Sequence, residues 1–283
     1  MIIGKLQYNN SFSEVERELA QYILEHPESV VEMNIRQLAL VSYSSPATIT
    51  RLCRKIGAKG FTDFKVKLSG ELHSQEKLNY LVDVNVPFQP EDSMEEIAKK
   101  LAGISLDSIR STRESFHYGR MENIVRCIMK SSVVDVYGEG DSLYAAFEFK
   151  NKMMRIRRQV RIEMGVTQQS YQAINSDPSH CAILISHSGE SRNVIRVAKA
   201  LKKRMVPIIL ITSEGESTLC TYASYIVRTG TKEKRSLLQK LTTYSSQTAV
   251  HYVLDCLFSF IYVKNYYENR DTAMQNEKYL DTL

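Results

Sequence analysis

The sequence lacks the features that would place it in a membrane, outside the cell or among metalloproteins. No apolar run in its 283 residues approaches the ~20 that a membrane-spanning helix needs. The N-terminus does not have the charged-then-apolar layout of an export signal. The five cysteines, at positions 53, 127, 181, 220 and 256, are scattered, odd in number and without a C-x-x-C pair. We therefore expect a reduced, cytoplasmic chain that needs neither a metal nor a cofactor.

What the chain does have is an uneven charge distribution. Its composition, 43% hydrophobic and 24% charged residues, is that of a soluble globular protein, and its length allows one large or two modest domains. The net charge is only +5, yet residues 51–67 contain six Lys or Arg against one acid, Asp63. Such a cationic patch is typical of nucleic-acid-binding proteins, although a solvated helix face can carry the same charge.

Helix signals around this patch form a helix-turn-helix pattern. Ser13 begins a capping box with the glutamate three residues on, ahead of an amphipathic helix. Asn34 then caps a short helix, and after the turn 42–45 a third helix over residues 46–56 starts on a proline and stops at Gly57. Two short helices joined by a small turn, the second one basic, are typical of a helix-turn-helix.

The outward face of this third helix carries small, hydroxyl and cationic side chains. Small and hydroxyl residues near its N-terminal end can approach base edges, while cations reach phosphates or guanine. The residues predicted to contact bases are Ser45, Thr48 and Arg51, with Thr50 on the same face, and those predicted to contact the DNA backbone are Arg54, Lys55, Lys59 and Lys65. Threonines on an exposed helix face often contact only water, so that alternative stays open.

A second set of signals starts where an apolar run ends in a loop rich in serine and glycine. Residues 181–185 are predicted to form a buried strand, followed by Ser186, Ser188, Gly189 and Ser191 and then by a helix. Ser191 is the natural N-cap, and the free N–H groups at a helix start attract anions. The pattern predicts a phosphate site, although an ordinary turn with capping serines would look similar.

A second loop of the same kind favours the phosphate site. It follows a predicted strand over residues 132–137 and contains Gly138, Gly140 and Ser142, but Leu143 stands where the dinucleotide fingerprint has its third glycine, so NAD is not predicted. Strands and helices then alternate up to a long last helix over 235–266, which predicts a doubly wound, three-layer α/β fold with a parallel sheet. Two loops at the carboxyl ends of parallel strands can converge on one ligand.

Together these loops resemble the sugar isomerase (SIS) domain, a phosphosugar-binding doubly wound fold, over roughly residues 93–268. The resemblance implies that Ser142, Ser186, Ser188 and Ser191 hold the phosphate of a phosphosugar. It places Gly138, Gly140, His187, Gly189 and Glu233 in the same site. The family's usual Ser-Arg pair in the last helix is Ser246-Gln247 here.

The basic region, from Ser45-Pro-Ala-Thr to Phe64-Lys65, closely resembles the N-terminal domain of RpiR-type transcriptional regulators, which join it to a C-terminal SIS domain. The expected organisation is an N-terminal all-α helix-turn-helix domain (1–75), a linker (76–92), an α/β SIS sensor domain (93–268) and a C-terminal tail (269–283). The expected partners are a double-stranded DNA operator and a phosphosugar effector. The last helix has more apolar residues than one buried stripe needs, so a homodimer or homotetramer is expected.

An enzyme is the main alternative, because SIS domains also occur in phosphosugar isomerases. Isomerisation needs a base beside C1 and C2 of the sugar, and the residues of a suitable type are Glu163, His187, Glu190, Glu233 and His251. A DNA-reading domain adds nothing to an isomerase, and two phosphate loops disfavour a purely structural DNA-binding protein. We therefore predict a regulator of sugar or amino-sugar metabolism without turnover.

Two further segments carry expectations of their own. Residues 150–161 hold six Lys or Arg, which fit either a second anion-attracting surface or the solvated back of a helix, and the second interpretation is favoured. Residues 80–86 are too apolar for a free linker, so part of the linker is expected to pack on a neighbouring surface.

Overall fold

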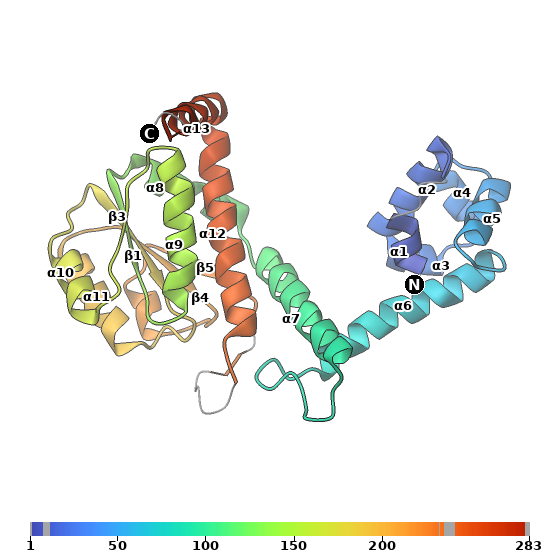
Figure 1. Ribbon diagram of the computed structural model, residues 1–283, viewed down its shortest axis with the longest axis horizontal. Coiled ribbons are helices and arrows are strands. Elements are labelled where there is room, and N and C mark those ends of the chain that lie inside the picture. Colours follow the sequence, from blue (N-terminus) through green and yellow to red (C-terminus); the bar gives the residue numbers. More distant parts are fainter. Residues whose placement is uncertain (1, 8–11, 232, 235–240, 281–283) are drawn as a thin grey trace. The chain divides into compact units, whose positions relative to one another are not determined.

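The computed structural model describes residues 2–7, 12–231, 233–234 and 241–280, and the chain divides into two compact units. The first unit spans Met1–Leu81 and the second Val82–Leu283 (Figure 1). Each unit has a hydrophobic core of its own. Among the described residues, no helix combines the length and the apolar character that crossing a membrane requires.

Every regular element described in the first unit is a helix: α1 (Ile2–Gln7), α2 (Glu14–Glu25), α3 (Pro27–Glu32), α4 (Ile35–Val41), α5 (Pro46–Lys55) and α6 (Phe61–Leu81). The predicted caps are confirmed, because Ser13 and Glu16 form a capping box at the start of α2 and Asn34 caps α4. The predicted helix-turn-helix is formed by α4 and α5, and α5 buries Ile49 and Leu52. The short helices α1 and α3 are additions that the sequence pattern did not indicate.

The second unit has the predicted α/β fold with a parallel sheet. Helices α7 (Met94–Glu114) and α8 (Tyr118–Lys130) precede the sheet. The elements that follow are β1 (Val133–Tyr137), α9 (Ser142–Arg155), β2 (Val160–Ile162), α10 (Val166–Ile174), β3 (His180–Ile185), α11 (Arg192–Lys203), β4 (Ile208–Thr212), the 3-10 helix η1 (Thr218–Thr221), β5 (Tyr225–Arg228), α12 (Tyr244–Lys264) and α13 (Tyr266–Leu280). The strand order is β2-β1-β3-β4-β5, and each neighbouring pair is parallel.

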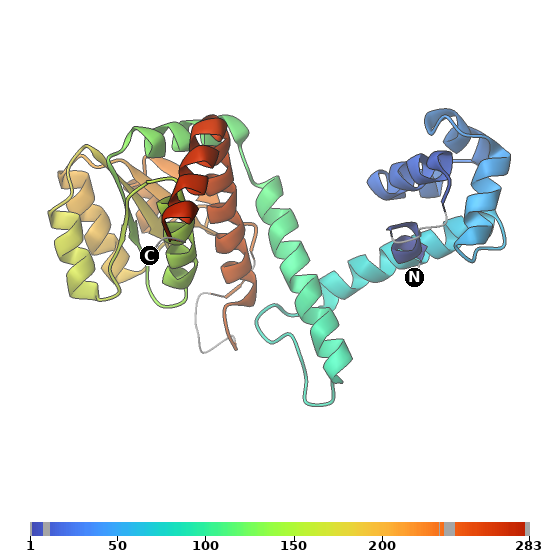
Figure 2. The same ribbon diagram turned by 45° about the horizontal axis from the view of Figure 1, so that its top comes forward.

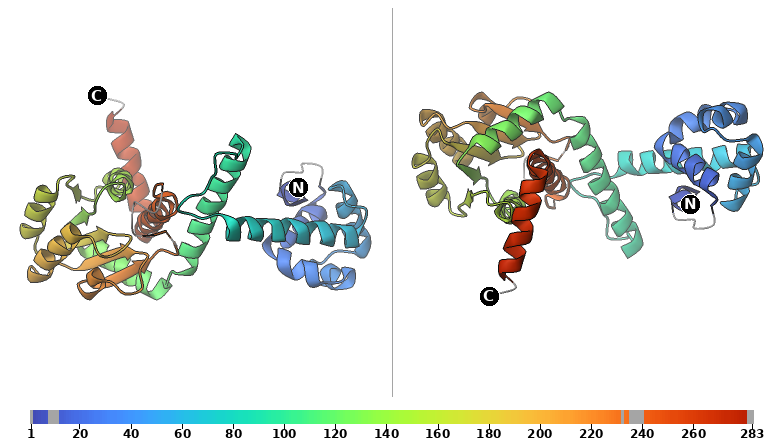
Figure 3. Two further views of the ribbon diagram at one scale, coloured as in Figure 1. Left: turned by 90° about the horizontal axis from the view of Figure 1, so that it is seen from below. Right: turned by 90° about the horizontal axis from the view of Figure 1, so that it is seen from above.

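Helices cover both faces of this sheet. Alternate side chains of β1 enter different cores: Val134 and Val136 pack with residues of α8, α9 and α12, whereas Tyr137 packs with residues of α10 and α11. Figure 1 shows α10 and α11 on one side of the sheet and α9 and α12 on the other, and the turned views in Figures 2 and 3 show the same three layers.

Three predicted boundaries differ from the structure. The last helix, predicted over 235–266, begins only at Tyr244, because residues 241–243 are not helical, and residues 235–240 lie outside the described residues. Helix α6 continues to Leu81, so residues 76–81 of the predicted linker are helical. Helix α13 makes residues 269–280 of the predicted tail helical. Both of these helical segments lack a clear apolar stripe, so hydrophobic periodicity gave no sign of them.

The remaining linker packs against its own unit, as its apolar character predicted. Asn85 is only 5% exposed. Its side-chain Oδ1 accepts a hydrogen bond from the N–H of Lys234 at 2.7 Å, and its carbonyl accepts one from the N–H of Leu241 at 2.8 Å. The segment after α6 is therefore part of the α/β unit.

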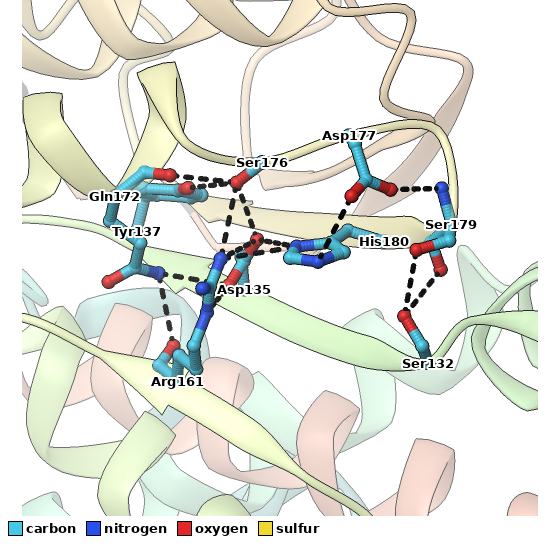
Figure 4. A network of polar contacts seen from close by, with 9 residues as sticks. All are labelled: Ser132, Asp135, Tyr137, Arg161, Gln172, Ser176, Asp177, Ser179 and His180. Atoms are coloured by element: carbon cyan, nitrogen blue, oxygen red, sulfur yellow. Dashed lines mark hydrogen bonds and ion pairs between the residues drawn. The ribbon is translucent and has the colours of Figure 1, made fainter.

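A buried carboxylate joins β1, β2 and β3 (Figure 4). Asp135, in the middle of β1, is fully buried and accepts hydrogen bonds from Arg161 Nε at 2.6 Å and Nη2 at 2.9 Å. His180 Nδ1 lies 2.8 Å from the same carboxylate, and Ser176 Oγ donates to it at 2.7 Å. These partners supply the hydrogen bonds and opposite charge without which a buried carboxylate is strongly unfavourable.

The same contacts explain much of the basic stretch 150–161. Arg161 points at Asp135, Lys152 pairs with acids on α9 and α12, and Arg158 donates to backbone carbonyls at the end of α8. These cations are engaged in contacts within the unit. Arg158 and Arg161 lie beyond the end of α9, so only part of the stretch is helix surface.

Replacing Asp135 should therefore destabilise the α/β unit. In Asp135→Ala, Arg161 and His180 lose the carboxylate that compensates their burial, and we expect unfolding free energy to fall by about 3 kcal/mol. Urea denaturation followed by circular dichroism measures this loss. Asp177→Asn is the matched control, because Asp177 faces the same His180 at 4.0 Å but is 62% exposed; its change should stay below about 1 kcal/mol. Equal losses in the two variants would contradict the role given to Asp135.

Candidate functional site

The two serine- and glycine-rich loops meet between β1 and β3, where the strand order of the sheet reverses. Strand β1 pairs with β3, and the helices that follow them, α9 and α11, cover opposite faces. In an open parallel sheet this arrangement leaves a crevice at the carboxyl ends of the two strands. The loops touch directly, since Ser191 Oγ donates to Glu139 at 2.5 Å and a Cβ built on Gly138 would lie 3.3 Å from the carbonyl of Ile185. The structure thus brings the two predicted loops together.

The loop between β3 and α11 (residues 186–191, the β3 loop) has the geometry expected of an anion site at the start of a helix. Ser191 is the N-cap of α11, as predicted, and its Oγ accepts a hydrogen bond from the N–H of Val194 at 3.3 Å. Ser188 is half-buried and its Oγ accepts from the N–H of Glu190 at 3.2 Å, while Ser186 is 7% exposed at the end of β3. Gly189 has φ +64°, and a Cβ there would lie 2.1 Å from Ser217 Oγ, so only glycine fits.

A cavity lies beside these loops and takes in only part of the predicted ligand set. Its described lining residues include Ser142 and His187, together with Thr212, Thr229, Ser246 and Gln247, but not Ser186, Ser188 or Ser191. The hydroxyl and amide groups of this wall suit the hydroxyls of a sugar, while Ala145, Ile211 and Val250 supply apolar wall. The sequence marked Gln247 only as standing where the family has its arginine. It gave no sign of the threonines, because they come from β4 and from the segments before α12, which only the fold brings together.

Glu233 and His187 are held by hydrogen bonds within the protein. Glu233 is 6% exposed, and its carboxylate accepts hydrogen bonds from Ser246 N–H and Ser246 Oγ, each at 2.7 Å. This carboxylate therefore sits at the first turn of α12, where the helix dipole favours negative charge. His187 Nε2 donates to the backbone carbonyl of Glu233 at 3.1 Å. Both residues thereby tie the β3 loop to α12.

Glu139 is a residue that the sequence reasoning missed. It is exposed in the loop between β1 and α9 (residues 138–141, the β1 loop). Its carboxylate accepts hydrogen bonds from Ser191 Oγ and Asn193 Nδ2. A carboxylate of the chain itself thus lies against the start of α11, where a phosphate is predicted to bind. The signal was present as an acid between the two glycines of the loop. Among the described residues, no group of three or more His, Cys, Asp or Glu is placed to hold a metal ion.

Four of the predicted DNA-contacting residues of α5 line one open, shallow surface groove, and Thr48 is not part of its described lining. Its lining includes Ala47, Thr50, Arg51, Arg54 and Lys55. At the N-terminal end, Ser45 is the N-cap and its Oγ accepts from the N–H of Thr48 at 3.1 Å. Thr50 Oγ1 donates to the carbonyl of Pro46 at 2.9 Å, and its oxygen can still accept a hydrogen bond.

A buried acid on α2 holds two of these cations. Glu16 is fully buried and accepts hydrogen bonds from Arg51 Nε at 3.0 Å and Lys55 Nζ at 2.6 Å. Burial alone would raise the pKa of Glu16, but the hydrogen bonds from Lys55, the Ser13 N–H and Arg51 outweigh it and lower the pKa to about 2. Arg51 keeps 61% of its side chain exposed, so its guanidinium is oriented without being covered.

The other residues predicted to contact the DNA backbone differ in whether their side chains are already engaged in contacts within the protein. Arg54 and Lys59 are exposed. Lys65, on α6, donates its Nζ to the carbonyl of Met33 at 2.9 Å and so helps to join α6 to the end of α3. Tyr43, in the turn between α4 and α5, is 97% exposed at φ 49°, and no sequence signal marked it.

Comparisons with known proteins agree with this two-part organisation. Residues 4–75 match the model of the helix-turn-helix domain of the rpiR family, and residues 128–256 match the SIS domain. The chain joins a helix-turn-helix domain of the rpiR family to a SIS domain. The RpiR helix-turn-helix match covers α1 to α5 and most of α6, and the SIS match runs from the end of α8 into α12.

Curated relatives and solved structures extend over both units. An uncharacterized HTH-type transcriptional regulator of Bacillus subtilis, YbbH, is 28% identical over 243 residues, which cover 86% of this chain and 83% of the relative. Another uncharacterized HTH-type transcriptional regulator, from Haemophilus influenzae, is 28% identical and covers 92% of this chain and 88% of its own length. The Vibrio vulnificus NanR protein, solved in complex with ManNAc-6P, shares the fold with a TM-score of 0.60 at 22% identity, covering 100% of this chain and 98% of that one.

The position of Glu139 leads to a prediction about anion affinity. In Glu139→Gln the negative charge beside the start of α11 disappears, and we expect inorganic phosphate to bind roughly fivefold more tightly, a change typical of removing one like charge at a partly exposed site. Isothermal titration at constant ionic strength measures the affinity. Glu190→Gln is the matched control, since Glu190 is an acid of the β3 loop that instead binds Thr218. A gain equal to that of Glu139→Gln in this control, or no gain in either, would contradict a specific role of Glu139.

Proposed function

We propose that this chain is a transcriptional regulator of sugar or amino-sugar metabolism that binds a DNA operator through α5 and a phosphosugar in the crevice between the β1 and β3 loops. The observation that carries the proposal is the presence, in one chain, of a cationic helix-turn-helix surface and of a hydroxyl-bearing cavity beside two serine-containing loops at the switch point of a SIS fold. The complex of Vibrio vulnificus NanR with ManNAc-6P supports an amino-sugar phosphate as a first effector to test. The phosphate would lie at Ser142, Ser186, Ser188 and Ser191.

A role without turnover fits the candidate bases better than catalysis does. Glu233 accepts two hydrogen bonds from Ser246, and His187 donates to a backbone carbonyl. Glu190 accepts from Thr218, and His251 Nδ1 lies 3.1 Å from Glu148. These four side chains already serve contacts within the protein, and the fifth candidate, Glu163, is exposed just after β2. The alternative, a phosphosugar isomerase with an accessory DNA-binding domain, predicts aldose–ketose conversion when the protein is incubated with aldose phosphates.

The proposed mechanism is thermodynamic linkage. A homodimer or homotetramer in the cytoplasm grips two operator half-sites, and the effector binds the operator-bound and free states with different affinities. The effector can then shift operator occupancy only by that difference. The loop contacts that a phosphate would replace, above all those of Glu139, are the first candidates for the change between the two states.

Effector binding should raise the stability of the α/β unit. A ligand at about a hundred times its dissociation constant adds roughly 2.7 kcal/mol. Thermal denaturation against a panel of sugar phosphates, including ManNAc-6P, should show one clear hit, and Ser186→Ala/Ser188→Ala should abolish it. The matched control is Ser132→Ala/Ser179→Ala, a pair of exposed serines just before β1 and β3, at the opposite ends of these strands from the loops. A hit that survives in the Ser186/Ser188 variant would refute the phosphate site.

Arg51 should discriminate between operator and random DNA. An arginine that contacts a guanine contributes about 1–3 kcal/mol of specificity, so Arg51→Ala should weaken operator binding more than binding to a scrambled duplex. Fluorescence anisotropy at one fixed salt concentration measures both affinities, after the operator has been selected from a random duplex library. Lys59→Ala is the comparison, because a phosphate contact is lost equally on both duplexes. Equal losses for Arg51→Ala would assign Arg51 to the DNA backbone.

A further inference from the structure

Two cysteines lie together near the amino-terminal ends of the strands, away from the β1 and β3 loops. Cys127 on α8 and Cys181 on β3 have their Sγ atoms 3.5 Å apart, and both thiols are free. Cys181 is fully buried, whereas Cys127 is partly exposed. The pair therefore consists of one thiol that solvent can reach and one that only its partner can reach.

The accessible thiol opens onto a cationic pocket. Cys127 lines a surface pocket where the strands begin, and the described lining also includes Arg126, Lys130, His180 and Ser179. No carboxylate belongs to the described lining of this pocket. Positive charge beside a cysteine favours the thiolate, which is the nucleophilic form, and a pocket open to water admits a small oxidant.

The surroundings of the two thiols differ in a way that divides their roles. The hydrogen bond with Cys181 lowers the pKa of Cys127. The same contact, together with burial, raises the pKa of Cys181 well above its usual value. Cys127 therefore loses a proton more easily than Cys181, as an attacking cysteine does relative to its resolving partner.

We propose that Cys127 is an oxidation site for hydroperoxides and that Cys181 is its resolving thiol. The Cys127 thiolate attacks one peroxide oxygen, the O–O bond breaks, and the leaving alkoxide or hydroxide takes up a proton from water, which leaves Cys127 as a sulfenic acid. The Cys181 thiol then attacks the sulfenic sulfur, an S–S bond forms, and the hydroxyl leaves with the Cys181 proton as water. The peroxide is reduced by two electrons and the two thiols are oxidised.

The crosslink would act on the strand that carries the effector loop. A disulfide needs its sulfurs about 2.05 Å apart, so α8 and β3 must approach each other relative to the 3.5 Å seen between the thiols. Strand β3 ends at Ile185, immediately before Ser186. Strand β3 therefore connects Cys181, near its amino-terminal end, directly to the loop at its carboxyl end. This inference does not depend on the function proposed above.

The test uses the full-length protein, hydrogen peroxide and peptide mass spectrometry after alkylation of the remaining thiols. We expect two of the five thiols to be lost, with Cys127 and Cys181 recovered as one crosslinked peptide. In Cys181→Ser, a sulfenic acid should accumulate on Cys127 and be trapped by dimedone. In Cys127→Ser, Cys181 should stay reduced because solvent does not reach it.

Cys220→Ser and Cys256→Ser are the matched controls, since both residues are partly exposed free cysteines outside the pair. Each control should form the Cys127–Cys181 crosslink at the wild-type rate. Oxidation of Cys220 or Cys256 ahead of Cys127 would overturn the proposal, as would a wild-type protein that keeps Cys127 reduced while the peroxide is consumed elsewhere. The wild-type measurement decides the question even where a cysteine variant fails to fold.

Discussion

The side-by-side placement of β1 and β3 is the constraint on which the α/β unit depends. Parallel strands need crossover helices, and here those helices leave to opposite faces, so the two loops have no helix between them. The buried Asp135 reinforces this arrangement, because its partners come from β2, from β3 and from the end of α10. The crevice is thus a product of strand order, and the serines only determine what it can bind.

Most of the architecture could be predicted because its signals are local. A capping box joins a side chain to a backbone N–H three residues away, which is why the start of α2 was evident from Ser13. The apolar run 181–185 likewise marked β3. The start of α12 was misplaced because residues 237–243 are apolar or helix-compatible in sequence, whereas the N–H of Leu241 bonds to the carbonyl of Asn85 instead of continuing a helix.

The sites were harder to predict, because charge partners are chosen by the fold. Sequence placed Arg51 and Lys55 on one helix face but gave no sign that Glu16, on another helix, binds both. Arg161 appeared as one of six cations and proved to be the partner of Asp135. Glu139 stood in a recognised loop, yet only the approach of α11 showed where its carboxylate points. Long polar side chains reach several possible neighbours, and spacing along the chain does not decide among them.

The Glu16 contacts bear on how the chain would search for its site on DNA. Much of the drive for non-specific binding comes from the release of small ions when protein cations neutralise phosphates. Glu16 already lies beside Arg51 and Lys55 as an anion of the chain itself. In the proposed complex with DNA these two cations would therefore release fewer small ions, while the oriented guanidinium of Arg51 could still donate directional hydrogen bonds to a base edge. An internal counterion of this kind lowers the affinity for any duplex and thereby raises the relative weight of base-specific contacts.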